Sequence, residues 1–315
     1  MKIAVMGTGG VGGYFGGLLA RAGQDVTFVA RGPHLDAIKR DGLRVASDLS
    51  GEFTVDAKAT DDTATLGTVD LVLYTVKMHQ NEEAIRAVAP MVGPDTVVLT
   101  LQNGIDNGDK LAAELGESHV MIGIALVQAR IGGPGLIEQL GQVGRIVFGE
   151  VARGLTPRGE NLLEQFRTGG WNAELSDNAL GALWQKFIYL TASASVNAVT
   201  QIEFGEMRTV PETRELLALA FQEVIDVGRA HGAPIGDDIM EWCMSSLDGF
   251  PADGMSSLAN DFRLRRRVEL EGLTGTVVRM GQEAHVPTPI HNTIYALLKP
   301  AANTIETAYL AGRDQ

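Results

Sequence analysis

The sequence predicts an α/β protein with an N-terminal domain built on a parallel sheet and an all-helical C-terminal domain. Short apolar runs of strand length alternate with helix-like periodicity through residue 175. A glycine-rich turn directly follows the first of these runs. After residue 176 the strand patterns end, and helical periodicity continues to the C-terminus. We therefore predict domains at residues 1–175 and 176–315, a division that suits a chain of 315 residues.

The first predicted strand, Lys2–Met6, leads into a G-x-G-x-x-G pattern and then a helix. This order is typical of a dinucleotide-binding Rossmann domain, although a glycine-rich turn also occurs in ordinary α/β domains. Gly7 permits the tight turn, Gly9 lets a pyrophosphate approach the backbone, and Gly12 allows the helix to pack closely on the strand. The N–H groups at the start of the helix then face the phosphates. The predicted phosphate loop comprises Gly7, Thr8, Gly9, Gly10, Val11 and Gly12.

The second predicted strand, Asp25–Ala30, indicates which nucleotide binds. NAD enzymes usually carry a carboxylate near the end of this strand, where it binds the ribose 2′-hydroxyl. Here the strand is followed by Arg31 and has no carboxylate at its end. A guanidinium can hold a 2′-phosphate through two charge-assisted hydrogen bonds. We therefore expect NADP(H) as the cofactor, the alternative being a solvated surface arginine.

Two later strands end in polar residues. The apolar runs at residues 69–76 and 96–101 are typical of buried parallel strands. Lys77 and Gln80 follow the first run, and Gln102 and Asn103 follow the second. Ligands of doubly wound sheets bind beyond the carboxyl ends of the strands, so these side chains are candidate ligand contacts. A solvated lysine and a helix-capping asparagine are the alternatives.

The rest of the first domain is predicted as shorter elements around the sheet. A long apolar strand at 120–130 and a hairpin around Gly141-Gln142 are expected as antiparallel additions at the sheet edge. The hairpin strands are predicted at 136–140 and 143–149. The other predicted elements are helices at 33–40 and 156–167 and strands at 43–46, 53–57 and 171–175.

Composition limits the classes of partner and the cellular compartment that we expect for this protein. The net charge of −13 argues against a nucleic-acid-binding protein, which would present a basic face. No apolar stretch approaches the ~20 residues that cross a membrane. The single cysteine, Cys243, excludes an internal disulfide, and no secretory signal pattern is present, so we expect a cytoplasmic protein. The six histidines show no ligand spacing, so we expect no metal site.

One long helix, predicted over Asp177–Val199, carries the polar residues of interest in the second domain. Lys186 lies on it among aromatic residues, where a lysine usually extends its charge to solvent. At about 100° per residue, Ser193 and Asn197 fall within about 20° of Lys186. Lys186, Ser193 and Asn197 thus form a ridge along the helix, which is either a polar strip facing a cleft or an ordinary exposed face. Farther along, the arginine-rich run at 263–267 is expected on a solvated helix face.

Seven stretches together resemble the ketopantoate reductase (2-dehydropantoate 2-reductase) family. The resemblance covers essentially the whole chain, and the stretches occur in the order of the family. It implies a Rossmann domain, a helical domain, an active site in the cleft between them, and either a monomer or a homodimer. It also implies NADPH-dependent reduction of ketopantoate to pantoate in pantothenate (vitamin B5 and coenzyme A) biosynthesis. The stretches are GTGGVGG, VARGPHL, YTVKMHQ, LQNGID, ALWQKF, MSSLANDF with VELEGLTG, and HVPTPIHNTIYALLK.

The resemblance also implies roles for individual residues. Lys186 matches the catalytic lysine, and Glu269 matches the glutamate that assists it. Arg31 matches the 2′-phosphate arginine, and Ser257 matches a substrate-binding serine. Asn103 matches an asparagine at both cofactor and substrate. The glycine loop, Lys77 and Gln80 match further cofactor-binding positions.

The sequence departs from the family pattern in the predicted substrate site. Many family members carry asparagines four and eight residues after the catalytic lysine, where this chain has Leu190 and Ala194. Ser193 and Asn197 are expected to replace them as substrate ligands. Three functions stay open: a ketopantoate reductase, a reductase of another branched 2-oxo acid, and an NADP-sensing protein without turnover.

Overall fold

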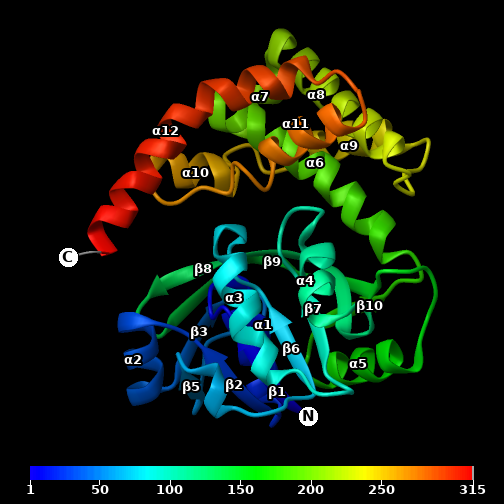
Figure 1. The fold of residues 1–315 in the computed structure, drawn as a ribbon. Helices are drawn as coiled ribbons and strands as arrows, with labels where there is room; N and C mark the ends of the chain where they lie inside the picture. Colours follow the sequence, from blue (N-terminus) through cyan, green and yellow to red (C-terminus); the bar gives the residue numbers. More distant parts are fainter. Residues whose placement is uncertain (314–315) are drawn as a thin grey trace. The chain divides into compact units, whose positions relative to one another are not determined.

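The computed structural model describes residues 1–313 and divides the chain into two compact units (Figure 1). The first unit, Met1–Leu183, is an α/β domain, and the second begins at Trp184 and is helical. The predicted fold class, a Rossmann-like sheet domain followed by a helical domain, is confirmed. The division falls within helix α6, Ala179–Thr200. The predicted domain boundary after residue 175 stays a prediction.

The first unit consists of one large sheet, five complete α-helices and the start of α6. Its strands are β1 Lys2–Met6, β2 Asp25–Val29, β3 Leu43–Ser47, β4 Phe53–Val55, β5 Lys58–Thr60, β6 Leu71–Tyr74, β7 Val97–Thr100, β8 Val120–Gly133, β9 Leu136–Glu150 and β10 Asn172–Leu175. Its helices are α1 Gly10–Arg21, α2 Gly32–Asp41, α3 Asn81–Val88, α4 Asn107–Leu115 and α5 Pro157–Thr168.

The order of strands brings the predicted ligand-binding segments to one edge. The sheet runs β4-β3-β9-β8-β7-β6-β1-β2-β5, and β10 pairs with β9 beside this path. Strands β7, β6, β1 and β2 are parallel neighbours. Their carboxyl ends therefore share one edge, from which the glycine loop and the segments after β2, β6 and β7 all leave the sheet.

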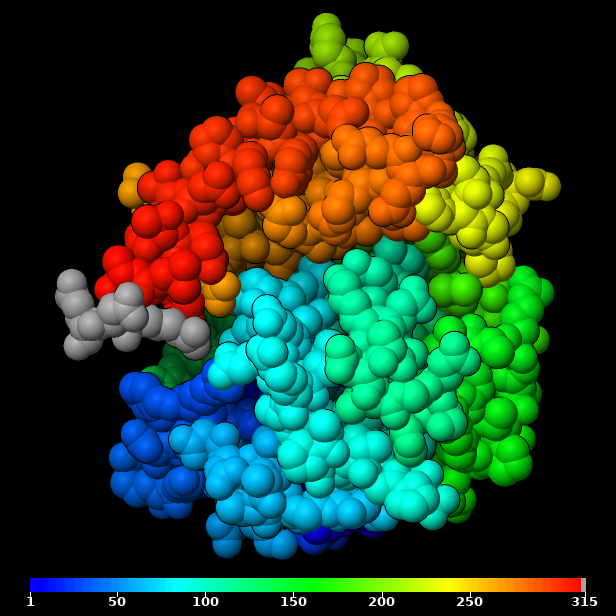
Figure 2. Space-filling model, in the orientation of Figure 1, coloured from blue at the N-terminus to red at the C-terminus, as the bar shows by residue number. Residues whose placement is uncertain are grey.

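The alternation of side chains along β1 explains how helices cover both faces of the sheet. Ile3 and Val5 belong to a buried cluster that includes Phe15 of α1. Ala4 and Met6 belong to a second cluster with side chains of α3 and α4. The space-filling view shows α3 and α4 in cyan to blue-green over one face of this unit (Figure 2). The central strands read as continuously apolar because both of their faces are buried.

The predicted hairpin around Gly141-Gln142 is wrong. Strand β9 runs unbroken through these residues and pairs antiparallel with β8, and the turn between them lies at Pro134-Gly135. Gly141 has φ +73°, and the pairing shifts register between Val127 and Gln128, so the glycine marks a bulge. These strands are also not at the sheet edge, because β3 and β4 continue the sheet beyond β9.

Over residues 184–313, the second unit consists of the C-terminal part of α6 and the helices that follow it. Among residues 1–313, no helix is long and apolar enough to cross a membrane. The arginine run does not lie on a helix face, because α10 ends at Arg263 and Arg265 adopts a φ of +52°. The helices after α6 are α7 Phe204–Thr209, α8 Pro211–Ala230, α9 Ile239–Gly249, α10 Ser257–Arg263, α11 Thr274–Glu283 and α12 Pro289–Arg313.

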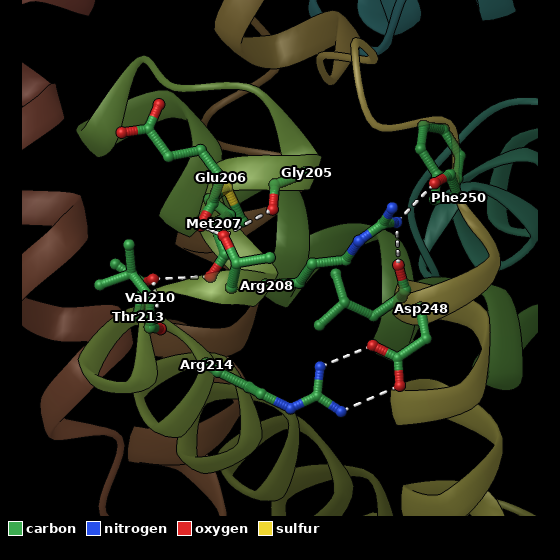
Figure 3. Close-up of polar contacts among 11 residues, drawn as sticks. Gly205, Glu206, Met207, Arg208, Val210, Thr213, Arg214, Asp248 and Phe250 are labelled. Atoms are coloured by element: carbon green, nitrogen blue, oxygen red, sulfur yellow. Dashed lines mark hydrogen bonds and ion pairs between the residues drawn. The ribbon is translucent and has the colours of Figure 1, made fainter.

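Two arginines fasten α9 to α7 and α8 (Figure 3). Arg208 of α7 donates to the backbone carbonyls of Leu247 and Phe250, at 3.1 and 2.6 Å. Arg214 of α8 binds both carboxylate oxygens of Asp248 at 2.6 and 2.9 Å. The carbonyls at the end of α9, which no further helical turn can satisfy, therefore find a donor.

Candidate functional site

The glycine loop has the geometry that a pyrophosphate site requires. Gly7 has φ +100°, a conformation that disfavours side chains. A Cβ on Gly12 would lie 2.3 Å from the carbonyl oxygen of Gly7, so only glycine lets α1 approach the loop this closely. A Cβ on Gly9 would meet nothing within 4 Å. The loop is thus tightly packed at Gly7 and Gly12 and open at Gly9, which fits a bound phosphate group.

The start of helix α1 also fits an anion. The helix begins at Gly10, its first turn contains no acidic residue, and no side chain caps it. Thr8, which is buried, fixes the loop by donating its hydroxyl to the Val29 carbonyl at 2.9 Å. The side chain of Thr8 therefore ties β1 to β2 and leaves the N–H groups of the helix for a ligand.

Arg31 lies at the start of α2, directly after β2, as the sequence predicts. Its guanidinium forms an ion pair of 2.8 Å with the carboxylate of Glu83 on α3. The two side chains are 47% and 56% exposed, so the pair is largely solvated. Sequence reasoning missed Glu83, because the contact joins residues far apart in the chain.

Lys77 and Gln80 lie together in a tight turn after β6. The backbone N–H of Gln80 donates to the Lys77 carbonyl at 2.8 Å, and the Gln80 side-chain oxygen accepts from the Lys77 N–H at 3.3 Å. The side chain of Lys77 is exposed at the carboxyl edge. This turn places a cation and an amide where an anionic cofactor would pass.

A buried chain of amides supports Asn103. Gln102 donates to the side-chain oxygen of Asn81 at 2.7 Å and to the Val76 carbonyl at 2.8 Å. Asn81 donates to Asn107 at 2.7 Å, and Asn107 donates to the Asn103 carbonyl at 2.6 Å. Sequence reasoning missed Asn81 and Asn107. Their shared position as the first residue of α3 and of α4 is a signal that could have found them.

Lys186 and Glu269 interact electrostatically within the second unit. Part of the Lys186 side chain is open to solvent, yet protein atoms surround it densely. Burial lowers the pKa of Lys186 to about 8, against the opposing effect of the Glu269 carboxylate, which raises it. Glu269 itself is buried. The structure therefore combines a lysine whose pKa lies near neutral pH with a carboxylate that favours its ammonium form.

Ser193 and Asn197 are both buried, so their ridge is not an exposed face. The Ser193 hydroxyl donates to the Tyr189 carbonyl one turn earlier in α6. Asn197 donates to the Ile202 carbonyl at 2.6 Å and accepts from the backbone N–H of Ser256 at 2.8 Å. Both side chains thus hold protein groups, and their binding of substrate stays a prediction.

The remaining substrate-site residues differ in exposure. Ser257 is exposed at the start of α10, next to Ser256, whose backbone Asn197 holds. Leu190 is partly buried, and Ala194 is completely buried. No group of three or more metal-binding side chains occurs among the described residues.

Two family models match the chain in the order of its units. The model "Ketopantoate reductase PanE/ApbA" matches residues 3–153, and "Ketopantoate reductase PanE/ApbA C terminal" matches residues 178–302. A crystal structure of a PanE/ApbA family ketopantoate reductase from Ralstonia eutropha JMP134 is 33% identical. It aligns over 97% of this chain and 100% of its own, with a TM-score of 0.90. The chain belongs to the ketopantoate reductase family. It is thus an oxidoreductase of that family.

Two further matches differ in what they show. A 2-dehydropantoate 2-reductase from Nostoc sp. is 29% identical over 95% of this chain and 94% of its own length. D-mandelate dehydrogenase, solved with NADH and anilino(oxo)acetate, is 22% identical over 97% of this chain and 100% of its own, with a TM-score of 0.88. At that identity, the second likeness concerns the fold alone.

Proposed function

We propose that this protein reduces 2-dehydropantoate to pantoate with NADPH, as a step of pantothenate biosynthesis. The observation that carries the proposal is the Lys186–Glu269 pair. A lysine whose pKa is about 8 is about nine-tenths protonated at pH 7 and is a stronger acid than an ordinary lysine. Such a group suits the protonation of a carbonyl oxygen. Family membership supports the same class of reaction.

The cofactor contacts in this proposal come from the first unit. The glycine loop and the start of α1 hold the pyrophosphate, and Arg31 holds the 2′-phosphate. Lys77, Gln80 and Asn103 contact the remainder of the cofactor, and Asn103 also reaches the substrate. When bound, NADPH supplies the hydride that reduces the C2 carbonyl.

The protonation in this proposal comes from the second unit. Lys186 donates a hydrogen bond to the carbonyl oxygen, which stabilises the negative charge that develops there, and then transfers its proton. Glu269 keeps Lys186 protonated and oriented through its charge. Ser257 binds the substrate. In each of these roles, a side chain of this protein supplies a hydrogen-bond donor or a charge.

A second candidate is a reductase of another branched 2-oxo acid with a more apolar tail. Leu190 and Ala194 favour it, because neither can hydrogen-bond a substrate hydroxyl or carboxylate. An unreplaced buried hydrogen bond typically costs ~1–3 kcal/mol. The two candidates share the cofactor and Lys186 and differ only in substrate.

The experiment is NADPH oxidation by the purified protein on ketopantoate, 2-oxoisovalerate and other branched 2-oxo acids. The proposal predicts the highest kcat/KM on ketopantoate, and a loss of at least about 100-fold in Lys186→Ala. A highest kcat/KM on another acid would favour the second candidate. NADPH binding without turnover on any acid, or near-normal turnover in Lys186→Ala, would contradict the catalytic assignment.

A further inference from the structure

The ion pair between Arg31 and Glu83 crosses the carboxyl end of β1. Arg31 follows β2, and Glu83 lies in the first turn of α3, which follows β6. Strand β1 lies between β2 and β6 in the sheet. Neighbouring strands are about 4.8 Å apart, so the pair joins segments roughly 10 Å apart across the strand that carries the glycine loop.

Glu83 therefore competes with a bound phosphate for the same guanidinium. Its carboxylate oxygen lies 2.8 Å from Arg31 Nη2, at hydrogen-bond distance. A 2′-phosphate takes hydrogen bonds from the same N–H groups of an arginine. A carboxylate close to that phosphate also repels it. A dinucleotide without the 2′-phosphate needs no hydrogen bond from Arg31 at this position, and the Glu83 carboxylate has no phosphate there to repel.

We propose that Glu83 is a second determinant of cofactor choice, which holds Arg31 in the free protein and so reduces the preference for NADPH over NADH. The inference rests on the proposed role of Arg31 at the 2′-phosphate. Because both side chains are about half exposed, the ion pair is readily broken. Its competition with the 2′-phosphate weakens the binding of NADPH by up to about fivefold. Glu83 adjusts cofactor preference and does not block binding.

The neighbouring Glu82 provides a matched control. It lies in the same turn of α3, is 88% exposed, and pairs with Arg86 at 3.1 Å. Glu82→Gln makes the same change in charge as Glu83→Gln without affecting the partner of Arg31. A difference between the two variants thus reports the Arg31 contact and not the net charge.

The test is a titration of wild type, Glu83→Gln and Glu82→Gln with NADPH and with NADH, followed by intrinsic fluorescence. We expect Glu83→Gln to lower the Kd for NADPH about three- to fivefold and to change the Kd for NADH less than twofold. Glu82→Gln should change neither by more than twofold. In an Arg31→Ala background the gain from Glu83→Gln should shrink.

Four results would each overturn the inference. The first is an unchanged NADPH Kd in Glu83→Gln, and the second is an equal gain in affinity for NADPH and NADH. The third is an equal gain in Glu83→Gln and Glu82→Gln, and the fourth is an undiminished gain in the Arg31→Ala background. In each case wild-type NADPH binding would leave the proposed function standing. A wild type that binds no NADPH would overturn the proposed function and this inference together.

Discussion

Arg31 is the residue that is proposed to bind the 2′-phosphate and so to favour NADPH. Arg31→Ala should weaken NADPH binding about 10-fold, the low end for a charged hydrogen bond, because the side chain is half exposed and paired with Glu83. NADH binding should change less than twofold. Parallel titrations of the variant with both nucleotides measure this, and an equal loss for both would exclude contact with the 2′-phosphate.

Leu190 is a position at which a single substitution should change the substrate preference. It is partly buried and lies one helical turn after Lys186, so an amide at this position would be a neighbour of the lysine. Leu190→Asn should shift the ratio of kcat/KM for ketopantoate over 2-oxoisovalerate upward about tenfold, since ketopantoate alone carries the extra hydroxyl. Steady-state rates on the two acids measure the ratio. An unchanged ratio would place Leu190 away from the substrate tail.

Sequence reasoning identifies residues whose signal is local and misses those whose signal is not. Gly7 is recognised because a turn between strand and helix demands its conformation, and its φ of +100° agrees. Glu83 is recognised only through its contact with a distant segment. The helical wheel places Asn197 beside Lys186, but it does not indicate that the amide binds the backbone of Ser256.

At the scale of elements, Asn197 links the end of α6 to the start of α10. Asn197→Ala leaves the Ser256 N–H and the Ile202 carbonyl without their side-chain partner, and should lower the free energy of unfolding by about 2–4 kcal/mol. Because Ser257 follows Ser256, KM should rise more than kcat falls. Denaturant unfolding and steady-state kinetics measure both effects.

Ser193→Ala is the comparison for that variant, because among the protein contacts it removes only a bond within α6. It should cost about 1 kcal/mol, and its KM reports whether Ser193 also binds the substrate. If Asn197→Ala destabilised the protein without raising KM, Asn197 would have a purely structural role. If Ser193→Ala raised KM instead, the serine would be the substrate ligand on this ridge.

Glu223 of α8 caps the start of α12. Its carboxylate accepts from the backbone N–H groups of Ile290 and His291, at 2.7 and 3.0 Å, and lies 2.7 Å from the His291 ring. Burial would raise the pKa of Glu223, but these hydrogen bonds outweigh it and lower the pKa below 4.5. A carboxyl group whose pKa is lowered by folding stabilises the protein above its unfolded pKa, and that stability is lost as the pH falls through the folded value.

We therefore expect Glu223→Gln to lower Tm at pH 7, and the gap between variant and wild type to narrow below about pH 4.5. Thermal unfolding followed by circular dichroism between pH 3 and 7 measures the gap. Glu215→Gln, which changes an exposed glutamate of the same helix, is the control and should leave Tm nearly unchanged. A gap that stays constant down to pH 3 would show that the Glu223 charge does not stabilise α12.

Elements were predicted best where one pattern dominates. Strands β6 and β7 were predicted within a few residues from their continuous apolar runs. Helix α6 was predicted equally well from its long stretch of helical periodicity. The hairpin failed because Gly141-Gln142 has the composition of a turn, whereas β9 absorbs it as a bulge. Pairing with β3 and β8 decides between these outcomes, and such pairing is not encoded in the local sequence.

At the scale of the whole molecule, the proposed function requires an acidic chain of net charge −13 to bind an anionic cofactor and an anionic substrate. It can do so only where cations are concentrated locally. The first unit offers Arg31 and Lys77 at the carboxyl edge of its sheet, and the second offers Lys186. Composition indicated this need, and motif spacing indicated the residues, but the electrostatic environment of Lys186 required the structure.

The measurement that tests the central claim most directly is kcat/KM for NADPH-dependent reduction of the best 2-oxo acid between pH 6 and 10. This quantity reports groups of the free enzyme. In the proposed mechanism, reduction requires the ammonium form of Lys186. Because the pKa of Lys186 is about 8, kcat/KM should be level below pH 7.5 and fall about tenfold per pH unit above about 8.5. Residual activity of Lys186→Arg should lack this fall, because a guanidinium stays protonated throughout the range. A wild-type profile level to pH 10, or the same fall in Lys186→Arg, would contradict Lys186 as the proton donor.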